Sequence, residues 1–325
     1  MPRGFAIAVV KVRVLAVAVV GLVLLVALVV TGRVAARKHP PAVLRSEDGN
    51  STVFVDFHRG RPPAGPRDEP PVPFFRLVDG RPSVALTFDC AWVPEAAGMK
   101  ILDFLKAQAI PTTFFISGPF VFRDYLKGMA GGLNEANFRM IRRMIADGHE
   151  FGNHTWTHPR NAGSIDWERE ITELRLGWDA VVRELFGAEP PANARMLPFW
   201  RAPFGEHDDR SLRMASRAGF PLHIGWTVDV HDGLGLPRCA EGPSNEQCND
   251  AKRMTDRVID FLDARSGPFD GVVVLAHLQN PYDWTGRPDG LARLVDTLAA
   301  RGIALRPLSE IFNWDLAPDR RPTSR

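Results

Sequence analysis

The 325-residue sequence carries little net charge, and this shortage excludes one class of partner. Its formal net charge is only +2, so it offers no concentrated basic surface of the kind that nucleic-acid binding usually requires. No nucleic-acid partner is therefore expected. At 45% hydrophobic and 24% charged residues, the composition is that of a globular protein. The length suffices for one large domain or two ordinary ones.

Charge is also absent from one long stretch near the N-terminus. No charged residue occurs between Arg13 and Arg33, and residues 14–30 are entirely apolar. A helix of about 17 to 19 such residues just spans the hydrocarbon core of a membrane. We therefore expect residues 1–37 to form a transmembrane anchor that holds the rest of the chain outside the cytoplasm, in the periplasm or cell envelope. A cleaved signal peptide, which would make the protein secreted, is the alternative.

Cysteine is scarce, with three residues in the chain. Cys239 and Cys248 enclose a polar segment, and two close cysteines on a long loop of an exported protein suggest a disulfide. Two free thiols are the alternative. If Cys239 and Cys248 pair, Cys90 is left over, and an odd cysteine in an exported protein needs an explanation.

The remaining chain divides into a linker, a globular region and a tail. Residues 38–81 are rich in Pro, Arg and Gly, which predicts an extended linker with one short strand at 52–57. From residue 82 to residue 312, apolar strand patterns alternate with amphipathic helix patterns, and residues 313–325 form a tail. Strands are expected at 84–88, 112–116, 222–228, 272–276 and 303–305, and helices at 96–109, 134–147, 166–186, 208–218, 253–264 and 290–301. This alternation predicts an α/β fold with a parallel sheet, and seven or eight repeats favour a distorted (β/α) barrel.

Candidate catalytic residues follow the apolar strands. Asp89, Arg201 and His277 each come directly after such a strand, where a barrel gathers the carboxyl ends of its strands. Each has an ordinary alternative: a turn or helix-capping role for Asp89, a surface position for Arg201 and an interior position for His277.

Two histidines have the spacing of metal ligands. His154 and His158 are four residues apart, so one turn of helix would place both imidazoles on one side, within reach of one metal ion. Pro159 ends any longer helix, which predicts a single turn in a loop. Many histidine pairs at this spacing bind nothing. His149, just before them, is interpreted as structural.

The order of these segments resembles that of the polysaccharide deacetylase (NodB-homology) family, whose domain carries five short motifs in this sequence. The resemblance covers about residues 82–310. The matching segments are TFDC at 87–90, GHEFGNHTWTH at 148–158, RAPFGEHDDR at 201–210, TVDVHD at 227–232 and LAH at 275–277, and TTFFISG at 112–118 is similar to the family's second strand.

The resemblance implies a metal-dependent hydrolase. His154 and His158 would bind a divalent metal, most often zinc in this family, which acidifies a bound water. Asp89 would be the general base that takes a proton from that water, and Arg201 would orient it. His277 would be the general acid that protonates the leaving amine.

The resemblance also implies supporting and substrate-binding residues. Asp232 would tune His277. Leu275 would line the pocket for the acetyl methyl group, and the backbone N–H of Phe204 would help hold the oxyanion. Trp226 is placed with them among the substrate-binding residues.

Two positions depart from the family's pattern. The family's third metal ligand is the second Asp of its first motif, and here that residue is Cys90. Either the Cys90 thiolate binds the zinc, or the two histidines and waters hold the metal alone. Gly233 stands where the family often has Trp, and the segment 233–250 is interpreted as an insertion that shapes the substrate groove.

The expected function is the removal of N-acetyl groups from an envelope or extracellular polysaccharide. Peptidoglycan, chitin-like oligomers and an exopolysaccharide all remain open as substrates. The alternative is a glycan-binding member of the fold without catalytic activity, which the substitution at Cys90 motivates. Hydrolysis of a small amide or an O-acetyl ester at the same site is a weaker third hypothesis.

Overall fold

The computed structural model describes residues 82–161, 163–239, 248–264 and 272–311, together with two strands at 42–45 and 52–55. All of them belong to one compact unit, Pro40–Arg325. The expected membrane anchor (1–37), most of the linker and the tail (313–325) lie outside the described residues. Within the described part of the chain, no helix is long and apolar enough to cross a membrane.

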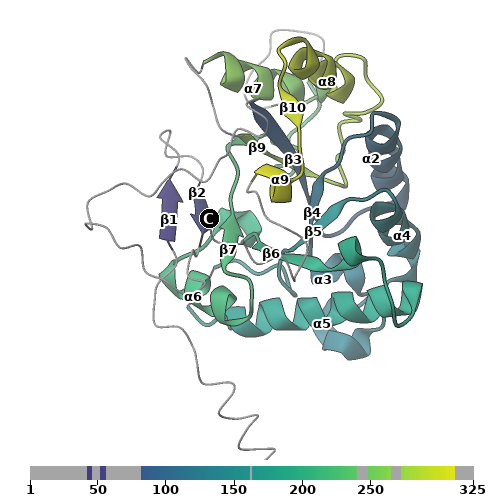
Figure 1. Ribbon diagram of the computed structural model, residues 1–325, viewed down its shortest axis with the longest axis vertical. Helices are drawn as coiled ribbons and strands as arrows, with labels where there is room; N and C mark the ends of the chain where they lie inside the picture. The colour runs from purple at the N-terminus through teal and green to yellow at the C-terminus, as the bar shows by residue number, and fades with distance from the viewer. Residues whose placement is uncertain are drawn as a thin grey trace, which may run out of the picture. The chain divides into compact units, whose positions relative to one another are not determined.

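A curled, mostly parallel sheet forms the centre of this unit (Figure 1). Its strands are β1 (Ala42–Arg45), β2 (Thr52–Val55), β3 (Ser83–Cys90), β4 (Thr113–Ile116), β5 (Glu150–Asn153), β6 (Met196–Trp200), β7 (Leu222–Ile224), β8 (Val228–Asp229), β9 (Val272–His277) and β10 (Ala304–Leu305). They pair in the order β1-β2-β7-β6-β5-β4-β3-β9-β8, and β10 pairs with the start of β3. Strands β3 to β10 are parallel to their neighbours among themselves, which confirms the predicted α/β class. Among the described strands the path ends at β8 and β1, so the barrel is open rather than closed.

Helices follow most strands, and several begin at a side-chain cap. They are α2 (Glu95–Ala107), α3 (Gly118–Val121), α4 (Phe138–Ala146), α5 (Trp167–Phe186), α6 (Asp209–Arg217), α7 (Ala251–Asp263), α8 (Leu291–Ala300) and α9 (Leu308–Ile311), with 3-10 helices at Tyr125–Gly131, Glu135–Asn137, Ala192–Ala194 and Pro203–Gly205. Asp166, Asp208 and Asp250 accept a hydrogen bond from a backbone N–H of the first turn of α5, α6 and α7. Such caps satisfy N–H groups that the helix itself leaves unpaired, so local sequence positions these helices.

The two faces of β3 have different roles because side chains alternate along a strand. Leu86, Phe88 and Cys90 lie in the large core between the sheet and the helices. Ala85 lies on the inner face, in a smaller core that α9 also lines. Asp89 belongs to the inner register, four residues after Ala85. The inner face of the curled sheet therefore carries the polar end of β3.

The predicted strand at 222–228 is in fact two strands that lie far apart in the sheet order. β7 pairs with β6, whereas β8 pairs with β9 at the opposite end of the path. The chain leaves one strand at Gly225 and joins the other after Thr227, whose backbone N–H donates to the carbonyl of Val273 (2.7 Å). This crossing brings residues 229–233 next to the end of β9.

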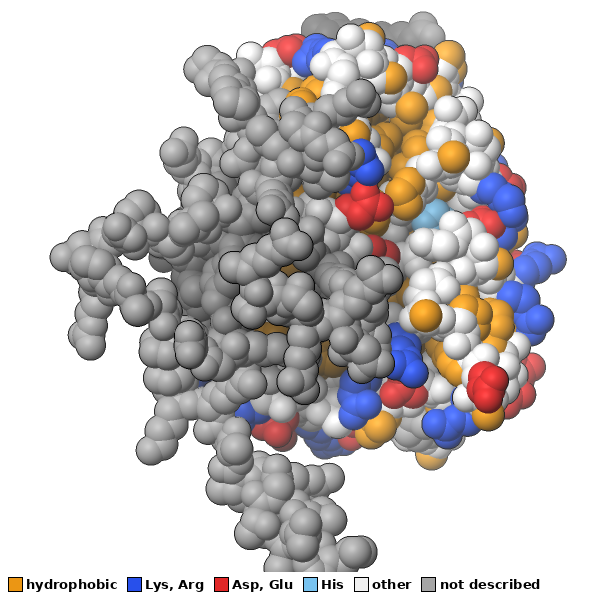
Figure 2. Space-filling view, in the orientation of Figure 1, with side chains coloured by type: hydrophobic (Ala, Val, Ile, Leu, Met, Phe, Trp, Pro, Cys, Tyr) orange, Lys and Arg blue, Asp and Glu red, His pale blue; other side chains and the backbone are white. Residues whose placement is uncertain are grey.

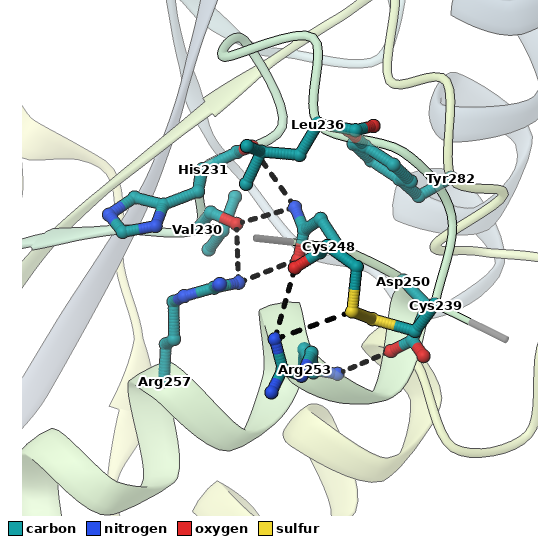
Figure 3. The surroundings of a disulfide bond; sticks show 10 residues. Val230, His231, Leu236, Cys239, Cys248, Asp250, Arg253, Arg257 and Tyr282 are labelled. Atoms are coloured by element: carbon teal, nitrogen blue, oxygen red, sulfur yellow. Dashed lines mark hydrogen bonds between the residues drawn. A yellow bond between two sulfur atoms is a disulfide. The ribbon is translucent and has the colours of Figure 1, made fainter. Parts of the chain in front are cut away.

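The predicted disulfide is present between Cys239 and Cys248 (Figure 3). Next to it, the Asn249 side chain donates to the backbone carbonyls of Val230 and His231 at 3.1 and 3.0 Å, and Arg257 donates to Asn249 at 2.6 Å. The disulfide thus closes the segment between Cys239 and Cys248 next to Asn249, whose side chain binds the loop after β8.

Removing this disulfide is expected to lower the free energy of unfolding. A cross-link that closes a loop of about ten residues contributes about 2–3 kcal/mol in the chain-entropy model, so Cys239→Ser combined with Cys248→Ser should lose that amount. Denaturant unfolding measures it. A reducing agent should lower the free energy of unfolding of the unmodified chain by the same amount and leave that of the double variant unchanged. Equal stability of the two proteins under oxidising conditions would contradict the prediction.

Candidate active site

A fully buried arginine organises the site. Arg201, directly after β6, has no exposed surface and donates to Asp89 (Nη1 to Oδ1, 2.7 Å) and to the hydroxyl of Thr87 (2.9 Å). It also donates to the carbonyls of Ile224 (2.9 Å) and Gly225 (3.2 Å). Its guanidinium lies over the ring of Phe115, 4.1 Å from the ring centre. Arg201 is thus in direct contact with Asp89, the residue that it was expected to orient.

His154 is held in one tautomer. Its Nδ1 lies 2.9 Å from the backbone carbonyl of Arg201, so Nδ1 carries the proton and donates it there. Its Nε2 then bears the lone pair and lies 3.3 Å from Oδ2 of Asp89. In histidines that bind metals, the ring nitrogen that does not face the metal is typically held by such a hydrogen bond.

The charge states at this contact leave two acceptors facing each other. Burial raises the pKa of Asp89, but His154, Arg201 and His277 together lower it below its usual value. Burial also lowers the pKa of His154 more strongly than Asp89 raises it. The hydrogen bond from Arg201 favours the ionised form of Asp89, and burial favours the neutral tautomer of His154 with its proton on Nδ1. A carboxylate oxygen and an imidazole lone pair at this distance, both buried, suit a bound cation.

His158 lies beside His154, although not on the predicted helical turn. Thr155 and His158 have positive φ angles of 71° and 55°, and residues 154–158 form no helix, so that prediction is wrong. The two imidazole rings nevertheless lie 4.9 Å apart, centre to centre. Burial, followed by the neighbouring His154, lowers the pKa of His158 to about 3, which keeps it neutral. Neutral imidazoles are the form that binds metal ions.

The structure does not bring Cys90 to the two histidines. Its side chain is fully buried in the large core with Phe88, on the register opposite to Asp89. Burial, followed by the charge of Asp89, raises the pKa of the Cys90 thiol well above its usual value. Among the described residues, no three His, Cys, Asp or Glu side chains form a group arranged to hold a metal ion. The chain offers two imidazole nitrogens beside Asp89, and Cys90 remains a neutral thiol.

His277 and Asp232 form a second charged pair. Nδ1 of His277 lies 2.8 Å from Oδ1 of Asp232, and the His277 backbone N–H donates to Oδ2 at 2.9 Å. Asn280 donates to the same Oδ2 at 3.0 Å. Burial lowers the pKa of His277, but Asp232, with a smaller effect from Asp89, raises it to about 9. Asp89 and His277 are register partners on β3 and β9, so an ionised carboxylate and a protonated imidazole lie on neighbouring strands.

Gly233 and Asn280 were not among the predicted site residues. A Cβ added to Gly233 would lie 2.4 Å from Cε1 and 2.8 Å from Nε2 of His277, so only glycine allows the chain to pass the ring here. The departure of Gly233 from the family's usual Trp was a signal in the sequence. Asn280 had none, because its contact with Asp232 depends on the loop after β9.

The three predicted substrate-binding residues lie around this centre. Leu275 is buried on β9, two residues before His277 and on the same face. Phe204 has a positive φ of 60° and is 50% exposed, and its ring lies 4.9 Å from that of His158. Trp226 lies 5.8 Å from the Arg201 guanidinium, in the segment that crosses from β7 to β8.

The arrangement suits a hydrolytic reaction that needs one group to accept a proton and another to donate one. One ionised carboxylate can accept a proton, and one protonated imidazole can donate one. Pairs of titratable groups whose surroundings separate their pKa values in this way are typical of general acid–base sites. On the face shown in Figure 2, one histidine is visible among hydrophobic side chains, with acidic side chains nearby.

Comparison with known proteins identifies the family. The family model described as "Polysaccharide deacetylase" matches residues 78–223. A chitooligosaccharide deacetylase of Sinorhizobium fredii is 30% identical over 246 residues, covering 72% of this chain and 94% of that protein. A peptidoglycan-N-acetylglucosamine deacetylase of Bacillus cereus is 27% identical over 230 residues, covering 70% and 68%.

The fold is also that of solved structures. A mutant of a CE4 family pseudoenzyme from Bacillus anthracis, described as having restored enzymatic activity, aligns with a TM-score of 0.52 and 22% identity. The alignment covers 75% of this chain and 72% of that one. The match with the rhizobial protein over nearly its whole length agrees with the order of motifs in the sequence. The chain belongs to the polysaccharide deacetylase family.

Proposed function

We propose that this chain is a metal-dependent N-deacetylase that acts on an N-acetylated glycan of the cell envelope or extracellular matrix. One observation carries the proposal: Asp89, which accepts from Arg201, and His277, which pairs with Asp232, are register partners on neighbouring strands. The same site holds the adjacent imidazoles of His154 and His158. The names of the two relatives, which act on chitooligosaccharides and on peptidoglycan N-acetylglucosamine, support the substrate class.

His154 and His158 would hold the metal. Their neutral state and the lone pair of His154 beside Asp89 fit a divalent cation, and imidazole ligands favour zinc over magnesium or calcium. When bound, such an ion polarises the acetamide carbonyl and lowers the pKa of water. With Cys90 in the core, the protein ligands are the two imidazoles, with Asp89 next to them.

The chain's own residues supply the proton transfers. Oδ2 of Asp89 accepts a proton from the attacking water, while Arg201 holds the other carboxylate oxygen in place. Oxygen bonds to the acetyl carbon, and the carbon–nitrogen bond then breaks. His277 donates its Nε2 proton to the departing amine, because Nδ1 is engaged by Asp232. The products are acetate and the free amino sugar.

A location outside the cytoplasm is part of the proposal. The apolar segment 14–30 supports membrane attachment. The Cys239–Cys248 disulfide supports an oxidising compartment, because cytosolic thiols are kept reduced.

The proposal predicts metal-dependent release of acetate. Zinc-loaded protein should release acetate from N-acetylated glycans, and a chelator should abolish the release until zinc is restored. Asp89→Asn should lower kcat by about 100- to 10,000-fold, because it removes the general base. The measurement is acetate production from chitin oligomers, peptidoglycan and an N-acetylated exopolysaccharide.

Matched variants make that experiment specific. Asp263→Asn removes an exposed carboxylate of α7 and should leave kcat unchanged. His154→Ala should lose zinc, whereas Cys90→Ala should retain the zinc stoichiometry of the unmodified chain. If zinc-loaded protein released no acetate from any of the glycans, a non-catalytic glycan-binding role would be favoured instead.

The pKa of His277 predicts the alkaline limit of activity. Because Asp232 raises this pKa above the value of 6.5 for a free histidine, the general acid stays protonated until the pH passes through the raised value. Asp232→Asn leaves burial, which lowers the pKa, without the opposing carboxylate. The alkaline limb of the kcat–pH profile should therefore move to lower pH in Asp232→Asn. An unchanged limb would remove His277 from the general-acid role.

Gly233 is expected to be required for the position of His277. Gly233→Ala places a methyl group against the imidazole, and displacement of a catalytic group by about 1 Å costs on the order of 100-fold in rate. Gly163→Ala, where an added Cβ meets nothing within 4 Å, is the matched control. The measurements are kcat and the melting temperature of both variants. Full activity of Gly233→Ala would refute the close packing.

A further inference from the structure

A cavity of about 360 Å³ lies on the Trp92 side of the active site. Its walls come from three segments that the mechanism does not use: the loop after β3, the start of α3 and the stretch around residues 122–137. Its lining combines apolar side chains, among them Pro119 and Phe122, with the polar Arg123 and Asn134. A concave space that offers both apolar surface and polar groups suits an amphipathic small molecule.

Trp92 connects this cavity to the proposed catalytic centre. The Trp92 side chain is 58% exposed, although it is one of the largest apolar groups in the chain. Its ring lies 5.6 Å from that of His158 and 6.1 Å from that of Tyr125. A molecule in the cavity would therefore lie within one aromatic ring of His158.

The aromatic rings beside His158 suggest an extended ligand. The ring of Phe204, which is 50% exposed and carries the Arg160 guanidinium over it, lies 4.9 Å from that of His158, and the Trp92 ring lies 5.6 Å from it. Exposed aromatic side chains provide rigid, amphipathic surfaces, and sugars present apolar C–H faces and polar edges that match them. An oligosaccharide can thus lie across the site with one unit at the catalytic centre and a neighbouring unit against Trp92.

The cavity also carries an unbalanced positive charge. Among the described residues that line it, Arg123 is the only charged one. Arg123 is exposed and forms no ion pair with a described residue, because its neighbour Asp124 pairs with Lys127 at 2.6 Å. Tyr125 and Asn134 add uncharged polar groups. A guanidinium in this setting favours a carboxylate, which it can bind through two parallel hydrogen bonds.

We propose that this cavity is a subsite for the sugar unit next to the one that is deacetylated, and that Arg123 selects a unit bearing a carboxylate. The proposal rests on the proposed deacetylase function and narrows its substrate class to acidic, N-acetylated glycans. Trp92 provides the stacking surface for that unit, and Arg123 binds its acid group.

Three tetrasaccharides test the subsite. One alternates N-acetylglucosamine with N-acetylmuramic acid and carries lactyl carboxylates, a hyaluronan tetrasaccharide carries uronic carboxylates, and chitotetraose carries none. Arg123→Gln should lower kcat/KM about tenfold for at least one acidic substrate, because this is the usual effect of losing a hydrogen bond to a charged group. The same variant should change kcat/KM for chitotetraose less than about twofold. The acidic substrate that responds identifies the source of the carboxylate.

Two further variants separate the roles of the residues. Arg213→Gln, an exposed arginine on α6 away from the cavity lining, should change none of the three values. Trp92→Ala should lower all three, and Trp92→Tyr should retain most of the activity. If Arg123→Gln lowered kcat/KM equally for the three substrates, or for none of them, the carboxylate subsite would be overturned.

Binding to the Asp89→Asn chain distinguishes this proposal from the deacetylase function. Calorimetric titration with the same tetrasaccharides is compared between Asp89→Asn alone and Asp89→Asn with Arg123→Gln. Arg123-dependent binding of an acidic tetrasaccharide without acetate release from any substrate would support the subsite and overturn the deacetylase. Acetate release without any dependence on Arg123 would do the reverse, and the absence of both would overturn both.

Discussion

The buried ion pair between Arg201 and Asp89 is the interaction on which the rest of the site depends. Moving a guanidinium and a carboxylate out of water costs several kcal/mol each, in round numbers, and is offset only when both are well hydrogen-bonded. Arg201 meets this condition with Asp89, Thr87 and the carbonyls of Ile224 and Gly225. The end of β6 is thereby fixed to β3 and to the end of β7. The carbonyl of Arg201 also sets the tautomer of His154, so one residue orients both the proposed base and a proposed metal ligand.

The same pair sets up an electrostatic contrast across β3 and β9. Asp89 is kept ionised by the positive groups around it, in spite of its burial. His277 is kept protonated chiefly by Asp232, in spite of its burial. Asp232 reaches His277 only because the chain crosses from β7 to β8 and returns beside β9. The long crossing therefore has a chemical consequence: it delivers the carboxylate that makes His277 an acid. The Cys239–Cys248 disulfide closes the segment that follows, next to Asn249, which donates a hydrogen bond to the carbonyl of His231.

Much of this architecture could be predicted because it is encoded locally. The α5, α6 and α7 helices follow from periodic apolar residues and an aspartate cap, and both signals lie within a few residues of the helix start. The break between β7 and β8 could not be read in the same way. In residues 222–228 apolar side chains alternate with His223, Gly225 and Thr227, which is the pattern of one continuous strand. The strand divides because Thr227 and Val228 pair with β9 rather than β6. That choice depends on tertiary contacts.

The site could be predicted in part, and the reasons differ by residue. The contact between His154 and His158 was expected from their spacing, but the expected helical turn is not what brings them together. Asn153 and Glu170 accept hydrogen bonds from Thr155 and Thr157 and hold the segment in a non-helical path. For Cys90 the sequence left both outcomes open, because the family's first motif places two site residues next to each other. In this chain β3 stays regular through Cys90, so Asp89 and Cys90 point to opposite faces.

The presence of Cys90 at a position where the family has Asp raises the question of whether the chain is a binder rather than an enzyme. The energetics of the buried charges argue for catalysis. A glycan-binding surface gains nothing from a fully buried Arg201, a desolvated Asp89 or a His277 with a strongly raised pKa, and all three cost folding free energy unless they are compensated. Here they are compensated by specific partners: Thr87 accepts a hydrogen bond from Arg201, and Asp232, which itself accepts from Asn280, pairs with His277. A fold that retains both the charged groups and their hydrogen-bonding supports is better explained by the proposed catalytic site than by a binding surface alone.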